Sequence, residues 1–165
     1  RKIMSDNEAD VRGANVRIPP PIAAALTIIA GYLLGRVAPI FPAFDLATPV
    51  RYWLGAIIIV AAIGVLGAWP MRLFNRSGQN VTPWSATPEI IVLGPYHFTR
   101  NPMYLMMVLV CFACALIFSE AWLLILTPIL GVSLYHIAIK HEEIYLEEKF
   151  GDSYRAYKRS VRRWI

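Results

Sequence analysis

The sequence predicts an all-α, polytopic membrane protein with four transmembrane helices and a cytoplasmic C-terminal amphipathic helix. Of its 165 residues, 57% are hydrophobic and only 16% are charged, whereas soluble domains average about 45–50% apolar and about 25% charged residues. The charges also leave four long uncharged windows along the chain. A helix that crosses the hydrocarbon core needs about 20 apolar residues, so each window is long enough to cross the membrane once.

The four uncharged windows are the predicted spans. They are residues 18–35, 52–71, 101–119 and 121–139, and they hold 18, 20, 19 and 19 residues. Runs such as IAAALTIIAGYLL show no polar face of the kind that a helix on the surface of a soluble protein has. A soluble helical bundle is therefore the less favoured interpretation.

The first two spans differ in character from the last two. They contain Ala and Gly but no ionisable side chain, a pattern typical of helices that pack closely as a scaffold. Little more than Ser119 and Glu120 separates the last two, so these spans form a tight antiparallel hairpin. Asn101 and Pro102 mark the start of the third span, because Asn is a favoured N-cap and Pro suits the first helical turn.

The chain after residue 139 predicts two further helices. Gly151 followed by Asp152 indicates that one helix ends near Phe150 and that a second begins at Asp152. The second is basic and amphipathic, so we expect it to lie along the cytoplasmic membrane surface with its aromatic residues as an interfacial belt. The apolar positions of this region follow helical spacing and are Leu146, Phe150, Tyr154, Tyr157, Val161 and Trp164.

The distribution of Lys and Arg predicts the orientation. Fourteen of the 16 lie in the N-terminal tail, the second connection and the C-terminal tail, which share one side if the chain crosses four times. Positive charge favours the cytoplasmic side, so we expect a multi-pass protein with both termini cytoplasmic, in the cell membrane if the source is prokaryotic. The net charge of +5 then reflects topology and attraction to anionic lipid. The expected partner is the lipid bilayer and not a nucleic acid, and the oligomeric state stays open.

A candidate polar site lies where the third and fourth spans meet the same membrane face. The start of the third span presents unpaired N–H groups and a partial positive charge beside Arg100, and such a place attracts anions. The antiparallel fourth span returns His141, Glu142 and Glu143 to that face. A ligand with both a cationic and an anionic group, such as a free amino acid head group, would suit this pair of features. An Arg100–Glu142 salt bridge that only holds the hairpin is an equally good interpretation of the charges.

Two sequence segments flank the hairpin, GPYHFTRNPMY before it and EEIYLEEKFGDSYRAYKRSVRRW after it. In this order and spacing they resemble the C-terminal half of the isoprenylcysteine carboxyl methyltransferase and phospholipid N-methyltransferase superfamily of integral membrane enzymes. The resemblance runs from residue 80 to the C-terminus. It implies an S-adenosylmethionine-dependent methyltransferase that releases S-adenosylhomocysteine and acts on a lipophilic or membrane-embedded acceptor. The chain would divide into a tail (1–17), two scaffold spans (18–71) and a catalytic region (72–165).

The resemblance also implies a set of cofactor-binding residues. Glu142 would hold the amino group of the cofactor with Glu143 nearby, and Arg100 or the helix start would meet its carboxylate. Segment 88–91 would add backbone contacts. The methyl transfer needs no metal and asks mainly for alignment of the reactants, and the general base, if there is one, is unknown. The implied cofactor-binding residues are Tyr96, Arg100, Asn101, Pro102, Met103, Tyr104, Glu142 and Glu143.

The methyl acceptor is less defined. The prenylcysteine enzymes of the superfamily carry Arg-His-Pro where this chain has Arg-Asn-Pro, and an arginine where this chain has Ala138. A lipid-borne or hydrophobic amine, thiol or hydroxyl is therefore at least as good a candidate as a prenylcysteine carboxylate. One candidate substrate contact is His136, which an intramembrane position turns toward the bundle interior; a packing histidine that is hydrogen-bonded to a neighbour is the slightly favoured alternative. The others are Lys140 and His141, which could replace the missing arginine.

Two other functions stay open on the sequence. A membrane reductase of the sterol-reductase type has a similar C-terminal hairpin and cationic tail and uses NADPH, although Glu142 and Glu143 would repel a phosphate-rich cofactor. A non-catalytic scaffold would use its charges only to fix topology. Cys111 and Cys114 form a C-x-x-C in mid-span, outside the context of a redox motif, and we interpret them as buried hydrophobic residues. The three histidines are too scattered to predict a metal site.

Overall fold

The computed structural model describes residues 18–40, 47–76 and 90–165, and helices dominate these segments. Three helices are long and apolar enough to cross a membrane, Pro20–Val37, Thr48–Arg76 and Ala121–Phe150, and a shorter apolar helix covers Pro102–Phe118. The predicted all-helical membrane class is thus confirmed. The second and fourth predicted spans belong to helices of 29 and 30 residues, which continue well beyond their uncharged windows.

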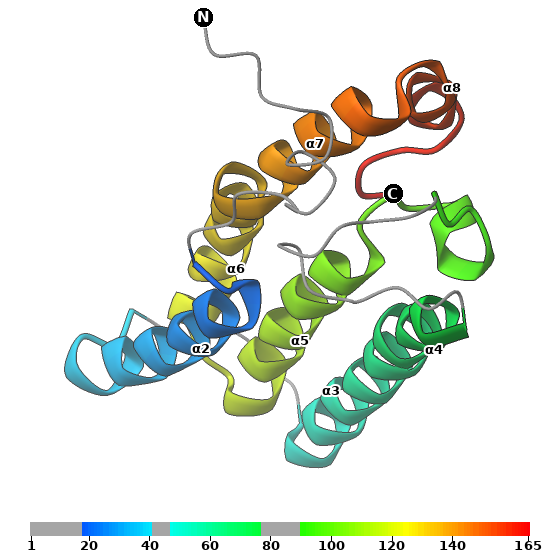
Figure 1. Ribbon diagram of the computed structural model, residues 1–165. Coiled ribbons are helices and arrows are strands. Elements are labelled where there is room, and N and C mark those ends of the chain that lie inside the picture. The colour runs from blue at the N-terminus through cyan, green and yellow to red at the C-terminus, as the bar shows by residue number, and fades with distance from the viewer. Residues whose placement is uncertain (1–17, 41–46, 77–89) are drawn as a thin grey trace, which may run out of the picture.

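Helix α5 lies at the centre of the structure, between α2 and α3 (Figure 1). Helix α5 packs against α2, α3 and α6, and α2 also packs against α6. A buried apolar cluster at this centre joins α2, α5 and the α6–α7 helix through Ala24, Cys111, Leu130 and Leu134. The elements in chain order are α2 (Pro20–Val37), α3 (Thr48–Ala61), the π-helical η1 (Ala62–Ala68), α4 (Trp69–Arg76), the 3₁₀ turn η2 (Gly94–His97), α5 (Pro102–Phe118), α6 (Ala121–Leu134), the π-helical η3 (Tyr135–Ile139), α7 (Lys140–Phe150) and α8 (Asp152–Ser160).

The outer surfaces of the first two long helices are apolar. Large hydrophobic side chains remain exposed along α2 and α3, which is the pattern expected where lipid replaces water as the solvent. The most exposed include Leu26, Ile29, Leu33, Trp53, Ile57 and Val60.

Glycines bring α2 and α3 close to the hairpin. A side chain at Gly31 would collide with Leu123 of α6, and one at Gly55 would meet Ile117 and, at 3.2 Å, the carbonyl oxygen of Ala113 in α5. Small residues at such contacts let the helix backbones approach closely. The packing role predicted for the small residues of the first two spans is therefore confirmed at these two positions.

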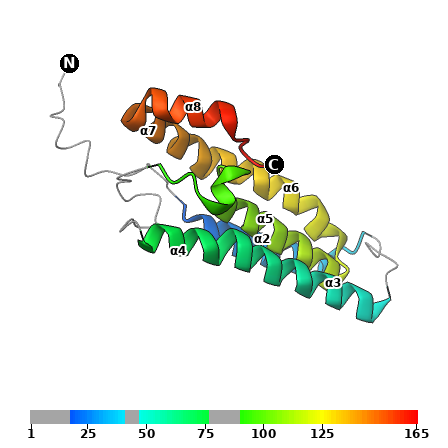
Figure 2. The same cartoon turned by 90° about the vertical axis from the view of Figure 1, so that its right-hand side faces the viewer.

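The end of the chain folds back on itself. Helix α7 ends at Phe150, Gly151 takes a positive φ of 52°, and α8 begins at Asp152, as predicted. Figure 2 shows α8 lying back along α7, with the chain after α8 returning toward the start of α5. Positive φ costs glycine little because it has no Cβ, so the sharp reversal occurs at this residue.

The apolar face of α8 contacts protein. Tyr154 and Tyr157 are 3% and 8% exposed and pack with Val161 in a cluster that also touches Ile90 and Leu146. The prediction that these tyrosines form an interfacial belt is wrong, because α7 already covers them. Helical periodicity predicted an amphipathic helix but did not identify the surface that covers its apolar side.

The start of α5 corrects a second prediction. Asn101 occupies the N-cap position and Pro102 the first turn, but the Asn101 side chain makes no capping hydrogen bond. Its Nδ2 instead donates to the backbone oxygen of Arg163 at 3.0 Å. The position was predicted correctly and the partner was not.

Candidate functional site

The start of α5 and the start of α7 meet in a polar cluster. The Tyr104 hydroxyl, on the first turn of α5, donates a hydrogen bond to Oε1 of Glu142 on α7. Arg100, two residues before α5, lies 3.3 Å from Oε1 of Glu143. The predicted meeting of these two features is confirmed by both contacts, which join residues about 40 positions apart in the chain.

The two adjacent glutamates have different partners. Glu143 binds Arg100 and also Arg163, whose Nε and Nη2 donate to its two oxygens at 2.8 and 2.9 Å. Glu142 accepts from Tyr104, and no cation pairs with it among the described residues. The hairpin salt bridge considered for Arg100 and Glu142 is therefore made by Glu143, and Glu142 keeps capacity for a further donor.

Arg100 is buried and incompletely paired. Its side chain is only 8% exposed, and its Nε and Nη1 make no hydrogen bond within the described part of the chain. An unpaired buried donor is costly, and more so when it is charged. Nitrogen atoms in this state favour binding of an anion that can accept from them.

A layer of tyrosines surrounds the charged cluster. The Tyr157 hydroxyl donates to the backbone oxygen of Tyr96 at 2.8 Å and so joins α8 to η2. Burial raises the pKa of Tyr96, and the nearby Tyr157 and Glu142 add to the rise. Burial also raises the pKa of Tyr154 to about 12, with a further contribution from Glu143. The raised pKa values keep the phenols of Tyr96 and Tyr154 neutral at physiological pH.

The remaining cofactor-binding candidates lie at the same place. Pro102 is fully buried in the first turn of α5, and Met103 beside it is partly buried. Of the predicted backbone segment, residues 88 and 89 lie outside the described residues, whereas Ile90 packs against the α8 cluster.

The three candidate substrate contacts differ from this cluster in their exposure. His136, Lys140 and His141 are all exposed, and the ring contact of His136 is with Tyr135, at 5.0 Å between centroids. Ala138, at the position of the arginine in the prenylcysteine enzymes, is completely buried in the central apolar cluster. These side chains lie at the surface of the described structure, and their role as substrate contacts stays a prediction.

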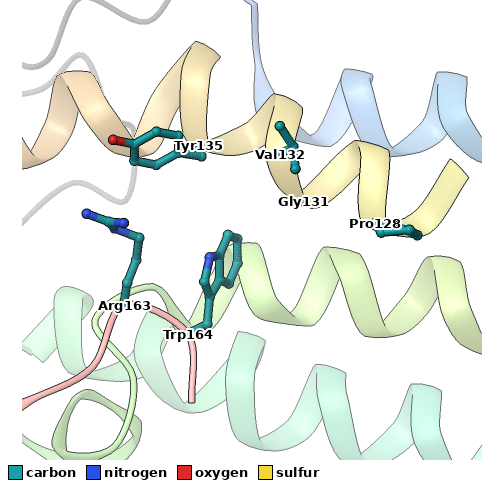
Figure 3. Close-up of a pocket in the computed structure, with 6 residues that line it drawn as sticks. All are labelled: Pro128, Gly131, Val132, Tyr135, Arg163 and Trp164. Carbon is teal, nitrogen blue, oxygen red and sulfur yellow. The ribbon is translucent and has the colours of Figure 1, made fainter.

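A hollow of about 310 Å³ lies next to the polar cluster. Figure 3 shows Arg163 and Trp164 projecting from the chain end toward α6 and η3, which supply the opposite wall. Arg163 both lines this hollow and binds Glu143, so the hollow and the charged cluster share a wall. The lining residues are Pro128, Gly131, Val132, Tyr135, Arg163 and Trp164.

Sequence reasoning missed the contribution of the chain end. Arg163, Trp164 and Thr99 were not among the predicted site residues, although Thr99 Oγ1 donates to the Arg163 backbone oxygen at 3.2 Å. The available signal was an Arg-Trp pair after a predicted helix reversal. A reversal at Gly151 returns the chain to the membrane face where α5 starts, and this could have suggested the contact.

Comparison with known proteins yields two matches. The sequence model of the phospholipid methyltransferase family matches residues 50–153, a stretch that extends from α3 to the start of α8 and contains the polar cluster apart from Arg163. A protein of Haemophilus influenzae, described as uncharacterized, is 48% identical over 65 residues, which are 38% of this chain and the whole of that protein.

Proposed function

The chain belongs to the phospholipid methyltransferase family and is a membrane methyltransferase, and we propose that it uses S-adenosylmethionine to methylate an acceptor that partitions into the bilayer. The observation that carries this proposal is that two opposite and incompletely satisfied charges, Arg100 before α5 and Glu142 on α7, belong to the same polar cluster. Arg100 has two unpaired buried nitrogens, and Glu142 has no cationic partner among the described residues.

The residues present fit the amino acid part of this cofactor. Glu142 would accept hydrogen bonds from the ammonium group, and the free Nε and Nη1 of Arg100 would donate to the carboxylate. Charge-assisted hydrogen bonds of this kind are about twice as strong as neutral ones. When bound, the cofactor supplies an electrophilic methyl group on its sulfonium.

The tyrosines and the first turn of α5 would orient these charges. Tyr104 fixes the Glu142 carboxylate through its hydroxyl, and Tyr96 and Pro102, which are both buried, would help to exclude water from the site. Orientation of the reactants is the main demand of the reaction and can lower the barrier by about 7–11 kcal/mol. We assign no general base.

We propose that the acceptor binds in the hollow beside Arg163. One side of it is formed by α6, where Pro128 and Val132 are exposed within the apolar helix, so a hydrophobic molecule could enter sideways from lipid. Tyr135 and Trp164 offer aromatic surface at the other end. These contacts replace His136, Lys140 and His141 as the acceptor residues in the proposal.

The proposed topology has four crossings with both termini in the cytoplasm. Helix α5 has 17 residues and spans about 26 Å, close to the lower limit for crossing, and it is enclosed by the three longer helices. In this arrangement α2 and α3 act as the scaffold and residues 72–165 as the catalytic region, with the polar cluster at the cytoplasmic face. The Lys and Arg distribution supports this orientation.

The test is ligand binding followed by labelling. Purified protein in detergent is titrated with S-adenosylhomocysteine and, separately, with NADPH by calorimetry. Binding of the first supports the proposal, binding of NADPH alone supports a reductase, and binding of neither supports a scaffold. Membrane lipid extracts incubated with the protein and radiolabelled S-adenosylmethionine then identify the acceptor as the species that gains label.

A further inference from the structure

The five residues after α8, Val161–Ile165, form a segment that we call the C-terminal strap. Three consecutive residues at the start of α5 bind its backbone. Arg100 N donates to the oxygen of Arg162 at 2.9 Å, and Thr99 Oγ1 and Asn101 Nδ2 both donate to the oxygen of Arg163, at 3.2 and 3.0 Å. The strap is thereby fixed against the polar cluster.

The side chains of the strap are fixed as well. Val161 is buried with the α8 tyrosines, and Trp164 packs against the central apolar cluster. The guanidinium of Arg163 lies 4.7 Å from the ring centroid of Tyr135 and makes its bidentate contact with Glu143. The Tyr135 ring and the Glu143 carboxylate together fix the orientation of the planar Arg163 guanidinium. The orientation of the Glu143 carboxylate in turn depends on the strap.

Glu143 contacts two arginines, and its contact with Arg163 is closer than its contact with Arg100. Arg163 engages both carboxylate oxygens at 2.8 and 2.9 Å, whereas Arg100 contacts only Oε1, through Nη2 at 3.3 Å. Arg163 already makes the fork-to-fork pair with this carboxylate, and Arg100 is left with a single, longer contact to it. This leaves Nε and Nη1 of Arg100 free and buried.

We propose that Arg163 is a positioning residue for cofactor binding: by occupying both oxygens of Glu143, it keeps two donors of Arg100 free for the carboxylate of the ligand. The proposal rests on the proposed function, since that carboxylate belongs to S-adenosylmethionine. Without Arg163, Glu143 pairs bidentately with Arg100 through Nη2 and one of the two nitrogens that are now free. Arg163 of the strap then belongs to the cofactor site indirectly, because it acts on the ligand through Glu143 and Arg100.

The single variants test the dependence on Arg163. Calorimetric binding of S-adenosylhomocysteine is compared for the unmodified protein, Arg163→Gln, Arg163→Lys and Arg159→Gln. We expect affinity to fall about tenfold in Arg163→Gln, which corresponds to the loss of one charge-assisted contact. Arg163→Lys keeps the charge but not the two parallel N–H donors, so its affinity should lie between those of the unmodified protein and Arg163→Gln. Arg159→Gln, an exposed arginine on α8, leaves affinity unchanged and is the matched control.

The double variant Arg163→Gln with Glu143→Gln separates positioning from a merely structural role. Removing the carboxylate frees Arg100 again, so affinity recovers relative to Arg163→Gln alone. A double variant that binds as weakly as the single one, or more weakly, overturns the inference, and so does unchanged affinity in Arg163→Gln.

The kinetic constants provide an independent readout. The KM for the methyl donor, measured at saturating acceptor, rises in Arg163→Gln by a larger factor than kcat falls, and a fall in kcat alone contradicts the inference. Thermal unfolding of each variant checks that it is folded. If the unmodified protein does not bind S-adenosylhomocysteine, the proposed function itself fails, and this outcome is distinct from equal binding by the unmodified protein and Arg163→Gln.

Discussion

The two ends of α5 lie in different surroundings, although the helix between them is apolar throughout. At its start, Arg100 and Tyr104 contact carboxylates of α7, and the C-terminal strap binds the residues just before the helix. At its end, the chain turns through Ser119, which has a φ of 53°, and passes directly into α6. Charges and hydrogen bonds hold the first end. Packing of side chains on glycines dominates at the second, where Trp122 Nε1 also donates to the Ala38 backbone oxygen at 2.7 Å.

This difference separates what stabilises the protein from what equips it to bind a ligand. The packed end relies mainly on small residues, such as Gly55 opposite Ile117. The polar end buries Arg100 and Glu143 at a cost in desolvation that buried pairs often fail to recover. Retaining such a cluster points to binding, so substitutions there should affect ligand affinity most, and substitutions at the packed end should affect stability most.

The largest effect is expected for Glu142→Gln. The variant keeps an acceptor for Tyr104 but loses the charge that would meet an ammonium group. Hydrogen bonds to charged groups contribute about 1.5–3 kcal/mol, so affinity for S-adenosylhomocysteine should fall about 10- to 100-fold. Calorimetric titration measures the affinity, and thermal unfolding should show a much smaller change.

The matched control for this prediction is Glu148→Gln, which removes an exposed carboxylate from the same helix. It should bind the ligand as the unmodified protein does. Equal affinity in Glu142→Gln and Glu148→Gln would show that Glu142 has no role in binding.

The packed end is tested by Gly55→Ala. A Cβ there would collide with Ile117 and approach the Ala113 carbonyl oxygen to 3.2 Å, and overpacking of this kind typically costs about 1–3 kcal/mol. We expect a loss of folding stability near the lower end of that range, because the Ile117 side chain can move. Thermal unfolding in detergent measures it, while ligand affinity at a temperature where the protein is folded stays unchanged.

Gly64→Ala provides the comparison for the packed end. Within the described residues no atom lies within 4 Å of a Cβ built at Gly64, so this substitution should be neutral or slightly stabilising. Equal destabilisation by the two substitutions would mean that contact with α5 does not determine the effect at Gly55.

Much of the fold could be predicted from the sequence because its signals are local. Uncharged windows located the long apolar helices, and Gly151 with Asp152 located the end of α7 and the start of α8. The surroundings of the apolar face of α8 were mispredicted, since an apolar stripe on a helix is equally compatible with contact to lipid and with contact to protein. Tyr154 and Tyr157 are covered by α7, and this depends on the chain reversal.

The helix start and the carboxylates of the site could be predicted from the sequence, but which charged side chains pair with each other could not. Helix starts and carboxylates can be located in a sequence, but adjacent residues on a helix point about 100° apart, so the choice between Glu142 and Glu143 as the partner of Arg100 needs coordinates. Arg163 follows Glu143 by 20 positions and reaches it only because α8 folds back. Long-range contacts of this kind leave no periodic signal.

A smaller effect is expected at Asn101, and it distinguishes the strap contact from a helix cap. Asn101→Ala loses the Nδ2 hydrogen bond to the strap and should lower stability by about 1 kcal/mol. Asn101→Asp would serve well as an N-cap but cannot donate to the Arg163 carbonyl oxygen. Thermal unfolding should therefore show Asn101→Asp to be at least as unstable as Asn101→Ala, and full stability of the Asp variant would restore the cap interpretation.

The smallest effect is expected for Cys111→Ala combined with Cys114→Ala. Both cysteines lie in mid-α5, between the two ends compared above; Cys111 is fully buried, and its thiol is 3.8 Å from the Ala24 backbone oxygen of α2. Their role in packing resembles that of the small residues near the hairpin turn, so the double variant should lose some stability and keep its methyl-transfer rate. The rate is measured as radiolabel transferred per minute to the acceptor lipid fraction, at a temperature where both proteins are folded. A large loss of rate in a folded double variant would place reactive chemistry in the middle of α5 and would contradict the division of the helix into a binding end and a packed end.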